Sequence, residues 1–288
     1  MDPQFAQLLV NGLAVGSIIA LAAIGLTLTY GILRLSNFAH GDFMTLGAYL
    51  TLVANTAGLN IWLAMLLGAV MTVIAVLVSE KLIWSPMRAR RASSTTLVII
   101  SIGLALFLRN GIILVWGGGN QSYNLPVSEA LPILGLRIAY YDVVVTVLAV
   151  LAIVALHYLL QNTRIGKAMR AVADDIDLAR VTGINVDRVV IWTWIIAGGL
   201  TALSGSMLGL VEAVRPNMGW FLILPLFAAV ILGGIGNPYG AIAGAIVIGI
   251  AQEVSTYWLP TEYKLGVALV IMLLVLLFRP QGIFRGTL

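Results

Sequence analysis

Three polar side chains lie close together in an otherwise apolar part of the chain, in the segment NFAHGDF at positions 37–43. A His two residues from an Asp, here His40 and Asp42, can relay protons. Asn37 or Asp42 could instead cap a helix that begins here, by accepting hydrogen bonds from free backbone N–H groups. Direct contact with a small molecule is the third interpretation. Catalysis is the least favoured of the three, and helix capping is favoured.

A further charged residue, Arg109, lies near the end of a long apolar run. We expect its guanidinium to extend to the headgroups of a membrane, and binding of a carboxylate inside the protein is the alternative. No metal site is expected, because the sequence contains no Cys and only two distant His. The triple glycine at 117–119 is not followed by Lys-Ser/Thr, so a nucleotide-binding role is not expected there.

The composition places these residues in a membrane. The chain has 288 residues, of which 60% are hydrophobic and 10% are charged, and its mean hydropathy is +1.03. These values are too apolar for an ordinary soluble domain. The net charge of +4 comes from scattered Lys and Arg, which indicates membrane topology and gives no sign of nucleic-acid binding.

Uncharged runs between successive charges predict the membrane helices, because a helix needs about 20 apolar residues to cross a bilayer. Two of the runs have 37 residues, and each is expected to fold into two spans, broken at NTAGLN (55–60) and at GGIGNPYG (233–240). We therefore expect an all-α, polytopic membrane protein that forms a single domain over 1–288. About nine spans, with eight or ten as alternatives, are expected near 8–32, 41–55, 61–80, 96–116, 142–160, 189–212, 221–235, 239–258 and 262–278.

The positions of the basic residues predict that the N-terminus lies outside and the C-terminus inside. With this orientation, three of the sixteen Lys/Arg lie outside, Arg109 lies within a span, and twelve lie in the cytoplasm. The cytoplasmic set comprises Arg34, Lys81, Arg88, Arg90, Arg91, five residues of the segment 161–188, Arg279 and Arg285. The segment 117–141 then forms the long external loop, with aromatic residues suited to a membrane surface.

The segment 161–188 differs from the rest of the chain, since its 28 residues hold five of the sixteen Lys/Arg and four of the twelve Asp/Glu. Thr163 is a suitable N-cap, and Gly183 could end a helix in the left-handed conformation, with Ile184 folding back on the last turn. One short amphipathic helix is predicted over 168–182, because apolar residues recur there at helical spacing: Met169, Val172, Ile176 and Ala179. It could lie on the membrane surface, but we favour a docking surface for a soluble partner.

Small residues at three- to four-residue spacing, including Gly240-x-x-x-Gly244, predict close helix packing, either within the chain or at a dimer interface. The sequence also suggests an internal repeat. Similar patterns of a span, a glycine-interrupted span and a third span surround NFAHGDF and GGIGNPYG. Interrupted spans at corresponding positions are typical of transport sites.

Five segments in the same order resemble the membrane permeases of bacterial ABC importers for branched-chain and other neutral amino acids. These segments are LTLTYGILRLSNFAHGDFMTLGAYL at 26–50, RIGKAMRAVADDIDLARVTGINVDRV at 164–189, IAGGLTALSG at 196–205, LGGIGNPYGAIAGA at 232–245 and FRPQGIF at 278–284. The resemblance extends over nearly the whole chain.

The resemblance implies a transport subunit of the bacterial cytoplasmic (inner) membrane, without enzymatic activity of its own. Its expected partners are a second, similar permease or a second copy of itself, two cytoplasmic ATPase subunits and a periplasmic substrate-binding protein, within membrane lipid. No cofactor is expected on this chain, because Gly166-Lys167 is followed by Ala168 and so does not form a phosphate loop. The partner ATPase would use the ATP.

The resemblance also implies residue roles. In ABC importers the coupling loop carries Glu-Ala-Ala, three residues and then Gly, and Asp177-Leu178-Ala179 followed by Gly183 is similar, although the later Ile-x-Leu-Pro portion is absent. The expected ATPase contacts are Arg170, Ala171, Asp174, Asp177, Ala179 and Gly183. The interrupted spans could offer helix ends to a zwitterionic amino acid. The expected path residues are Asn37, His40, Asp42, Arg109, Gly234, Gly236 and Asn237.

Three other functions are considered. A urea or short-amide importer would use a closely similar permease, and the membrane sequence does not separate the two. An ion-coupled secondary transporter would need carboxylates at mid-membrane, whereas each Asp and Glu is expected near a span end. An intramembrane enzyme would need convergent catalytic groups, and we identify no such constellation.

Overall fold

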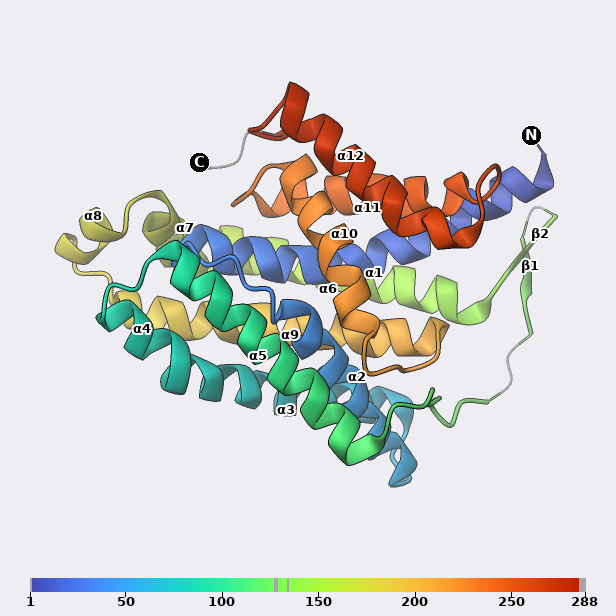
Figure 1. Cartoon of the computed structure of the whole chain (residues 1–288), viewed down its shortest axis with the longest axis horizontal. Coiled ribbons are helices and arrows are strands. Elements are labelled where there is room, and N and C mark those ends of the chain that lie inside the picture. Colours follow the sequence, from blue (N-terminus) through green and yellow to red (C-terminus); the bar gives the residue numbers. More distant parts are fainter. Residues whose placement is uncertain (1, 127–128, 134, 285–288) are drawn as a thin grey trace.

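The computed structural model describes residues 2–126, 129–133 and 135–284, and this part of the chain is almost entirely helical (Figure 1). Arg285, expected on the cytoplasmic side, lies outside the described residues. Within the described residues, seven helical segments are long and apolar enough to cross a membrane. They are α1 (Pro3–Leu33), α3 (Ile61–Ser79) continued by the π-helical turn η1 (Glu80–Trp84) and α4 (Ser85–Ala89), α5 (Ser94–Trp116), α6 (Tyr140–Asn162), α9 (Val186–Val211), α11 (Pro238–Ser255), and η2 (Thr261–Tyr263) with α12 (Lys264–Phe278).

Two further helices are shorter. The helices α2 (His40–Thr56) and α10 (Met218–Gly233) have 17 and 16 residues. At about 1.5 Å per residue they are roughly 25 Å long, less than the ~30 Å hydrocarbon layer. A helix therefore occupies each of the nine predicted spans, but α2 and α10 are too short to cross the bilayer unaided.

Both predicted breaks are present. Asn60 accepts the backbone N–H of Trp62 and caps α3, after Gly58 has turned the chain with φ +96°. Asn237 caps α11 by accepting the backbone N–H groups of Tyr239 and Gly240. In each case an amide side chain satisfies helix N–H groups that have no partner within the helix.

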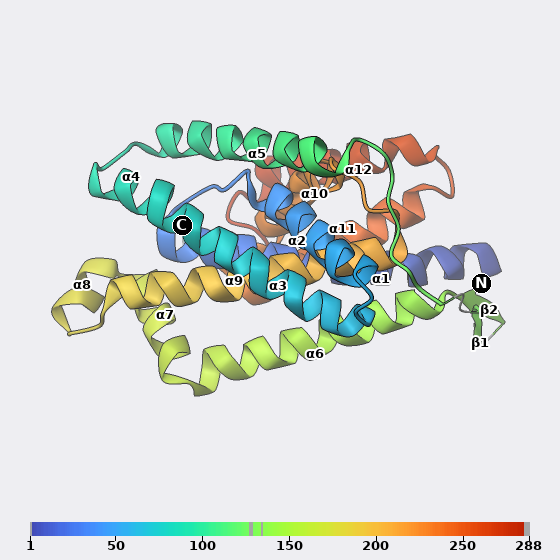
Figure 2. The same cartoon turned by 90° about the horizontal axis from the view of Figure 1, so that it is seen from below.

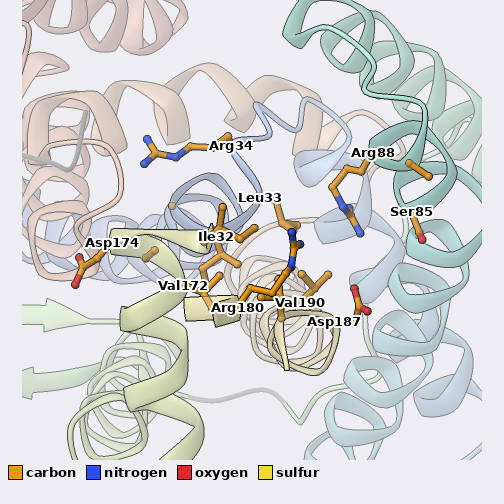
Figure 3. Close-up of a pocket in the computed structure, with 15 residues that line it drawn as sticks. Ile32, Leu33, Arg34, Ser85, Arg88, Val172, Asp174, Arg180, Asp187 and Val190 are labelled. Atoms are coloured by element: carbon orange, nitrogen blue, oxygen red, sulfur yellow. The ribbon is translucent and has the colours of Figure 1, made fainter. Parts of the chain in front are cut away.

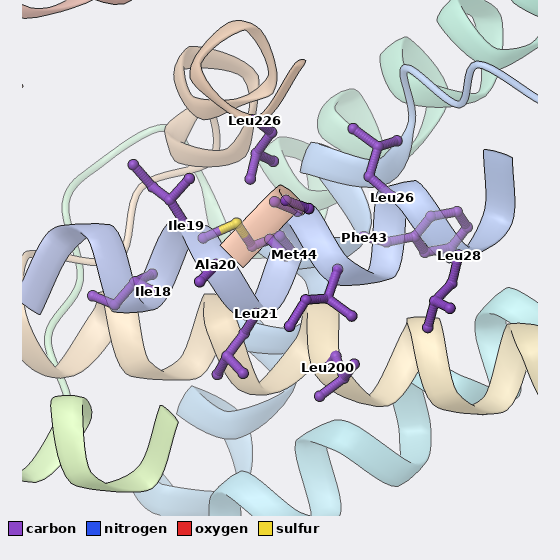
Figure 4. Close-up of a cluster of buried hydrophobic side chains, with 14 of the residues drawn as sticks. Ile18, Ile19, Ala20, Leu21, Leu26, Leu28, Phe43, Met44, Leu200 and Leu226 are labelled. Carbon is purple, nitrogen blue, oxygen red and sulfur yellow. The ribbon is translucent and has the colours of Figure 1, made fainter. Parts of the chain in front are cut away.

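The helix α1 runs through the centre of the bundle and is buried along most of its length (Figures 1 and 2). Small residues allow its close approach to α11, because a Cβ at Gly249 would overlap the backbone of Gly16. The motif Gly240-x-x-x-Gly244 packs within the chain, with Gly240 against Gly233 and Gly244 against Ala229. Figure 4 shows the apolar core around α1, which includes Ile18, Leu21, Leu26, Met44, Leu200 and Leu226.

The segment 34–39 between α1 and α2 is not helical and returns into the bundle beside α1 (Figure 1). As a result, His40 at the start of α2 lies against Ala22 and Gly25, well before the end of α1 at Leu33. Irregular backbone at this depth is tolerated because protein surrounds it. The first turn of α2 is therefore inside the bundle.

The two ends of the bundle differ (Figures 1 and 2). The N-terminus and a hairpin of β1 (Leu131–Ile133) and β2 (Leu136–Ile138) lie at one end. At the opposite end lie α4, α7 (Arg164–Asp174), α8 (Ile176–Val181) and the last described residues. The predicted external loop is anchored by Tyr123, whose hydroxyl donates to the carbonyl of Ala48 at 3.1 Å. Burial raises the pKa of the Tyr123 phenol, which therefore stays neutral.

Candidate functional site

The first turn of α2 holds a buried ion pair with α5. The Nε and Nη2 atoms of Arg109 lie 3.0 and 3.2 Å from the two carboxylate oxygens of Asp42. The Asp42 side chain is fully buried and the Arg109 side chain is 14% exposed. Two parallel bonds of this kind match the planar guanidinium to the carboxylate and fix both side chains. Arg109 therefore binds a carboxylate within the protein and does not extend to the membrane surface.

The first turn of α10 completes this cluster. The Trp220 ring lies under the guanidinium carbon of Arg109, 4.2 Å from its centroid, in a cation–π arrangement. Gly41 and Gly219 bring the starts of α2 and α10 into backbone contact, since a Cβ on either would overlap the carbonyl of the other. Thr45 accepts the backbone N–H of Gly219 at 3.0 Å. Two helix N-termini, each with a partial positive charge, thus meet beside the ion pair.

His40 is fully buried and held in place. Its Nε2 lies 2.8 Å from the carbonyl oxygen of Ala22 and 3.0 Å from the hydroxyl of Thr201. Gly25 makes room for the ring, because a Cβ there would contact its Cε1 atom. His40 does not pair with Asp42, so the arrangement offers no His-Asp proton relay.

Asn37 supports the turn that precedes α2. Its Oδ1 accepts the backbone N–H of Ala39 at 3.1 Å within this turn, and no side chain caps α2, so the predicted capping role is wrong for Asn37. Its Nδ2 is buried without a partner among the described residues. Asp42 does not cap the helix, because both of its oxygens bond to Arg109.

The second interrupted segment lies at the other end of α10. Gly234 and Gly236 have φ values of +105° and +89°, which favour glycine in this turn. The N–H of Gly236 donates to Thr27 of α1 at 2.8 Å. The expected path residues thus fall into two groups, 37–42 with Arg109 and 234–237, and the length of α10 separates them.

The charged segment forms two helices where the sequence predicted one. α7 ends at Asp174, and Asp175 has extended backbone with φ −153°. The carboxylate of Asp175 accepts the backbone N–H groups of Asp177 and Leu178 and so caps α8. The single helix over 168–182 is therefore wrong, because an Asp side chain competes for backbone N–H groups and starts a new helix.

The ends of this segment agree with the prediction. Thr163 caps α7 by accepting the N–H of Gly166. Gly183 has φ +89°, its N–H bonds to Arg180, and the N–H of Ile184 bonds back to Ala179 at 3.0 Å. This pair of bonds is a Schellman motif.

The break changes which side chains face outward. Ile176, predicted on the buried stripe, is 40% exposed, and Leu178 and Val181 are 60% and 80% exposed. Of the six expected ATPase contacts, Arg170, Asp174 and Asp177 are exposed, Ala171 is half-buried, Ala179 is buried, and Gly183 forms the turn. The apolar patch of α8, defined as Ile176, Leu178 and Val181, was missed because a continuous helix would have turned Ile176 inward.

A cavity of about 480 Å³ opens beside this segment. Its walls come from the end of α1, α4, α7, α8 and the start of α9. Figure 3 shows Arg88 and Arg180 reaching into it from different walls. Arg88 also forms an ion pair with the buried Glu80 of η1, whose carboxylate accepts the indole N–H of Trp194 in α9.

The sequence did not single out several residues of these clusters, including Thr45, Glu80, Trp194, Thr201 and Trp220. Their partners are distant in the chain, so no local pattern indicated them. Among the described residues no group of three His, Asp or Glu side chains is placed to hold a metal ion. The expected absence of a metal site remains a prediction.

Comparison with known proteins adds three findings. The family described as branched-chain amino acid transport system, permease component, matches residues 8–276. The chain is 34% identical to the high-affinity branched-chain amino acid transport system permease protein LivH of Escherichia coli K12 and 33% identical to BraD of Pseudomonas aeruginosa. In both cases the alignment covers 97% of this chain and 95% of the relative.

Among solved structures, PsaBC from Streptococcus pneumoniae in complex with Fab is similar in fold. Its TM-score is 0.55 at 14% sequence identity, and the match covers 96% of this chain and 92% of that chain. At this identity the likeness concerns the arrangement of helices alone.

Proposed function

Because the chain belongs to the family of permease components of branched-chain amino acid transport systems, we propose that it carries leucine, isoleucine and valine across the cytoplasmic membrane of a bacterium. It is a transport subunit of an ABC importer, and a permease of this kind acts together with an ATPase and a substrate-binding protein. The match over nearly the whole chain is the observation that carries this proposal.

The assembly that we propose contains two permease subunits, two ATPase subunits on the cytoplasmic side and a binding protein outside. The second permease is either a related chain or another copy of this one. ATP binds to the ATPase subunits, and this chain holds no cofactor. The N-terminus lies outside and the C-terminus inside, which places α7, α8 and the 480 Å³ cavity toward the ATPase.

We assign the ATPase contact to the exposed faces of α7 and α8. Arg170, Asp174 and Asp177 offer charges, and the apolar patch of α8 is exposed at an end of the molecule that lipid does not cover. Exposed apolar side chains in an aqueous region are typical of a protein interface. Ala171 and Ala179 lie beneath this surface, and Gly183 forms the turn that ends α8 beside it.

The substrate path is assigned to the region where α2, α5 and α10 meet. Asp42 and Arg109 offer opposite charges to the ammonium and carboxylate groups of an amino acid, and Asn37 and His40 hold the turn beside them. The turn at Gly234, Gly236 and Asn237 marks the cytoplasmic end of the same path. In the described conformation the ion pair is closed, so substrate passage requires it to open.

Reconstitution tests this function. The chain, its second permease, the ATPase and the binding protein would be placed in vesicles, and uptake of labelled leucine would be measured with ATP and with an ATPase variant that cannot hydrolyse it. We expect uptake of leucine only with active ATPase. Uptake of urea without leucine would favour the related urea importer, and uptake by the chain alone without ATP would overturn the importer assignment.

A further inference from the structure

A chain of solvent-exposed side-chain hydrogen bonds joins α7 to the start of α11. We call α7 the coupling helix, because it carries part of the proposed ATPase contact. Arg170 of α7 donates to the Oε1 of Gln161 at 2.9 Å. Gln161 donates from its Nε2 to the hydroxyl oxygen of Tyr239 at 3.1 Å, and this hydroxyl lies 2.9 Å from the Nδ1 of His157. His157 and Gln161 lie one turn apart on α6, so the bonds join three helices, with α6 between α7 and α11.

The Tyr239 oxygen accepts from Gln161, and its contact with the Nδ1 of His157 runs in the direction that the His157 tautomer sets. The groups form one network, so a change of one partner affects the next. The substitution Tyr239→Phe would keep the ring but remove the hydroxyl that both Gln161 and His157 contact.

Tyr239 is also rigidly connected to the turn at 234–237. Its backbone N–H donates to the Asn237 side chain, and the N–H of Gly236 donates to Thr27 of α1. The backbone N–H groups of Ile283 and Phe284 donate to Leu232 and Gly233 at the end of α10. Gly240 of α11 also packs directly against Gly233 of α10, and Asn237 donates to the carbonyl of Phe284. These contacts hold the first turn of α11 to the last turn of α10.

The same region contains space for a small movement. A cavity of about 90 Å³ is lined by residues of α1, α6, α7 and the turn, among them Gly31, Gln161, Arg170, Gly236 and Tyr239. At its other end α10 carries Gly219 and Trp220, which touch Gly41 and Arg109. A displacement of α7 can thus reach the ion pair of Asp42 and Arg109 through α10.

We propose that Tyr239 is the positioning residue that attaches the coupling helix to the α10–α11 hairpin, so that movement of α7 opens the Asp42–Arg109 pair through Trp220. This proposal rests on the proposed function, because it requires that an ATPase moves α7. Tyr239 itself acts through Gln161 and Arg170 and needs no contact with substrate.

The test compares Tyr239→Phe and Gln161→Leu with Tyr158→Phe in the assembled, reconstituted complex. Tyr158 lies next to His157 on α6 with its side chain 64% exposed, so its variant is a matched control. The measured quantity is the ratio of leucine taken up to ATP hydrolysed. We expect this ratio to fall about fivefold in Tyr239→Phe and in Gln161→Leu, which is the effect of losing one hydrogen bond.

The double variant should fall no further than the more affected single variant, because both substitutions break the same chain. The amount of copurified ATPase should equal the wild-type amount. A ratio within twofold of the Tyr158→Phe control would overturn the proposal. A lower ratio that is fully explained by less copurified ATPase would overturn it as well. If the wild-type complex takes up no leucine, the proposed function fails, and stimulation of ATP hydrolysis by the binding protein still compares the variants.

Discussion

Buried polar residues concentrate where α2, α5 and α10 meet, and three of them on α2 have partners on other elements. Asp42 binds Arg109, His40 binds Ala22 and Thr201, and Thr45 binds Gly219. An unpaired charge at this depth would be costly, whereas a paired and hydrogen-bonded one is tolerated. The pairing of Asp42 with Arg109 therefore stabilises the closed cluster in the described conformation.

Single and double substitutions of Asp42 and Arg109 test whether their ion pair has a role in transport. Asp42→Asn leaves Arg109 without a counter-charge and should destabilise the protein by about 3–5 kcal/mol, and Arg109→Gln should act similarly. The double variant should regain most of this stability, because neither charge is then left unpaired. Thermal unfolding of the purified complex gives the stability, and leucine uptake gives the activity. Wild-type uptake by a stable double variant would show that the pair is purely structural.

Close backbone contact between Gly41 and Gly219 gives a second prediction. A methyl group at position 219 would overlap the carbonyl of Gly41, so Gly219→Ala should lower the melting temperature by roughly 3–10 °C. Gly103→Ala is the control, because its Cβ meets no atom within 4 Å. Equal melting temperatures for the two variants in detergent would contradict the packing of α2 against α10.

At the scale of elements, two short helices and one broken helix distinguish this bundle from a set of simple spans. α2 and α10 begin inside the protein, and α7 and α8 divide at Asp175. Pro225 lies inside α10, and a proline in a helix removes one backbone bond and permits bending. α10 can therefore bend while it connects the turn at 234–237 to Trp220.

The apolar patch of α8 predicts a loss of ATPase binding on substitution. Leu178→Ser with Val181→Ser should reduce the copurified ATPase at least about tenfold, because exposed apolar anchors dominate interface energies. The fold should be retained, since both side chains face outward. The control is Val154→Ser on α6, an exposed position in the membrane span. Undiminished ATPase in the double variant would locate the contact elsewhere.

At the scale of the whole molecule, the two ends carry different groups. The β1–β2 hairpin and the N-terminus lie at one end, and α4, α7 and α8 lie at the other (Figure 1). Arg34, Arg88 of α4 and the basic residues of the segment 161–188 lie at the second end. An excess of Lys and Arg is typical of a cytoplasmic face. The proposed orientation places this basic end in the cytoplasm.

Because the sequence contains no Cys, single introduced cysteines can test this orientation directly. Ser122→Cys in the external loop should react with a membrane-impermeant maleimide in intact cells. Thr182→Cys, which follows α8, should react only after the membrane is opened. Both positions are exposed, so the labelling depends only on which side of the membrane the maleimide can reach. The reverse pattern would require the opposite orientation.

The sequence by itself determined the membrane class, the positions of nine helices, the breaks at NTAGLN and GGIGNPYG, and the family. These features depend on local properties, namely apolar length, capping residues and glycine, which a linear pattern contains. Helix caps such as Thr163 and the Gly183 turn were predictable for the same reason.

Only the tertiary structure decided which groups meet. The partners Asp42 and Arg109 are 67 residues apart in the chain, and Thr201 lies 161 residues from His40. Tyr239 meets Gln161 across 78 residues. The spacing of apolar residues along the sequence does not predict such pairings. They depend on which faces of the helices pack together and at what depth each helix begins. The entry of α2 and α10 into the bundle therefore determines the site, while the helices themselves follow from the sequence.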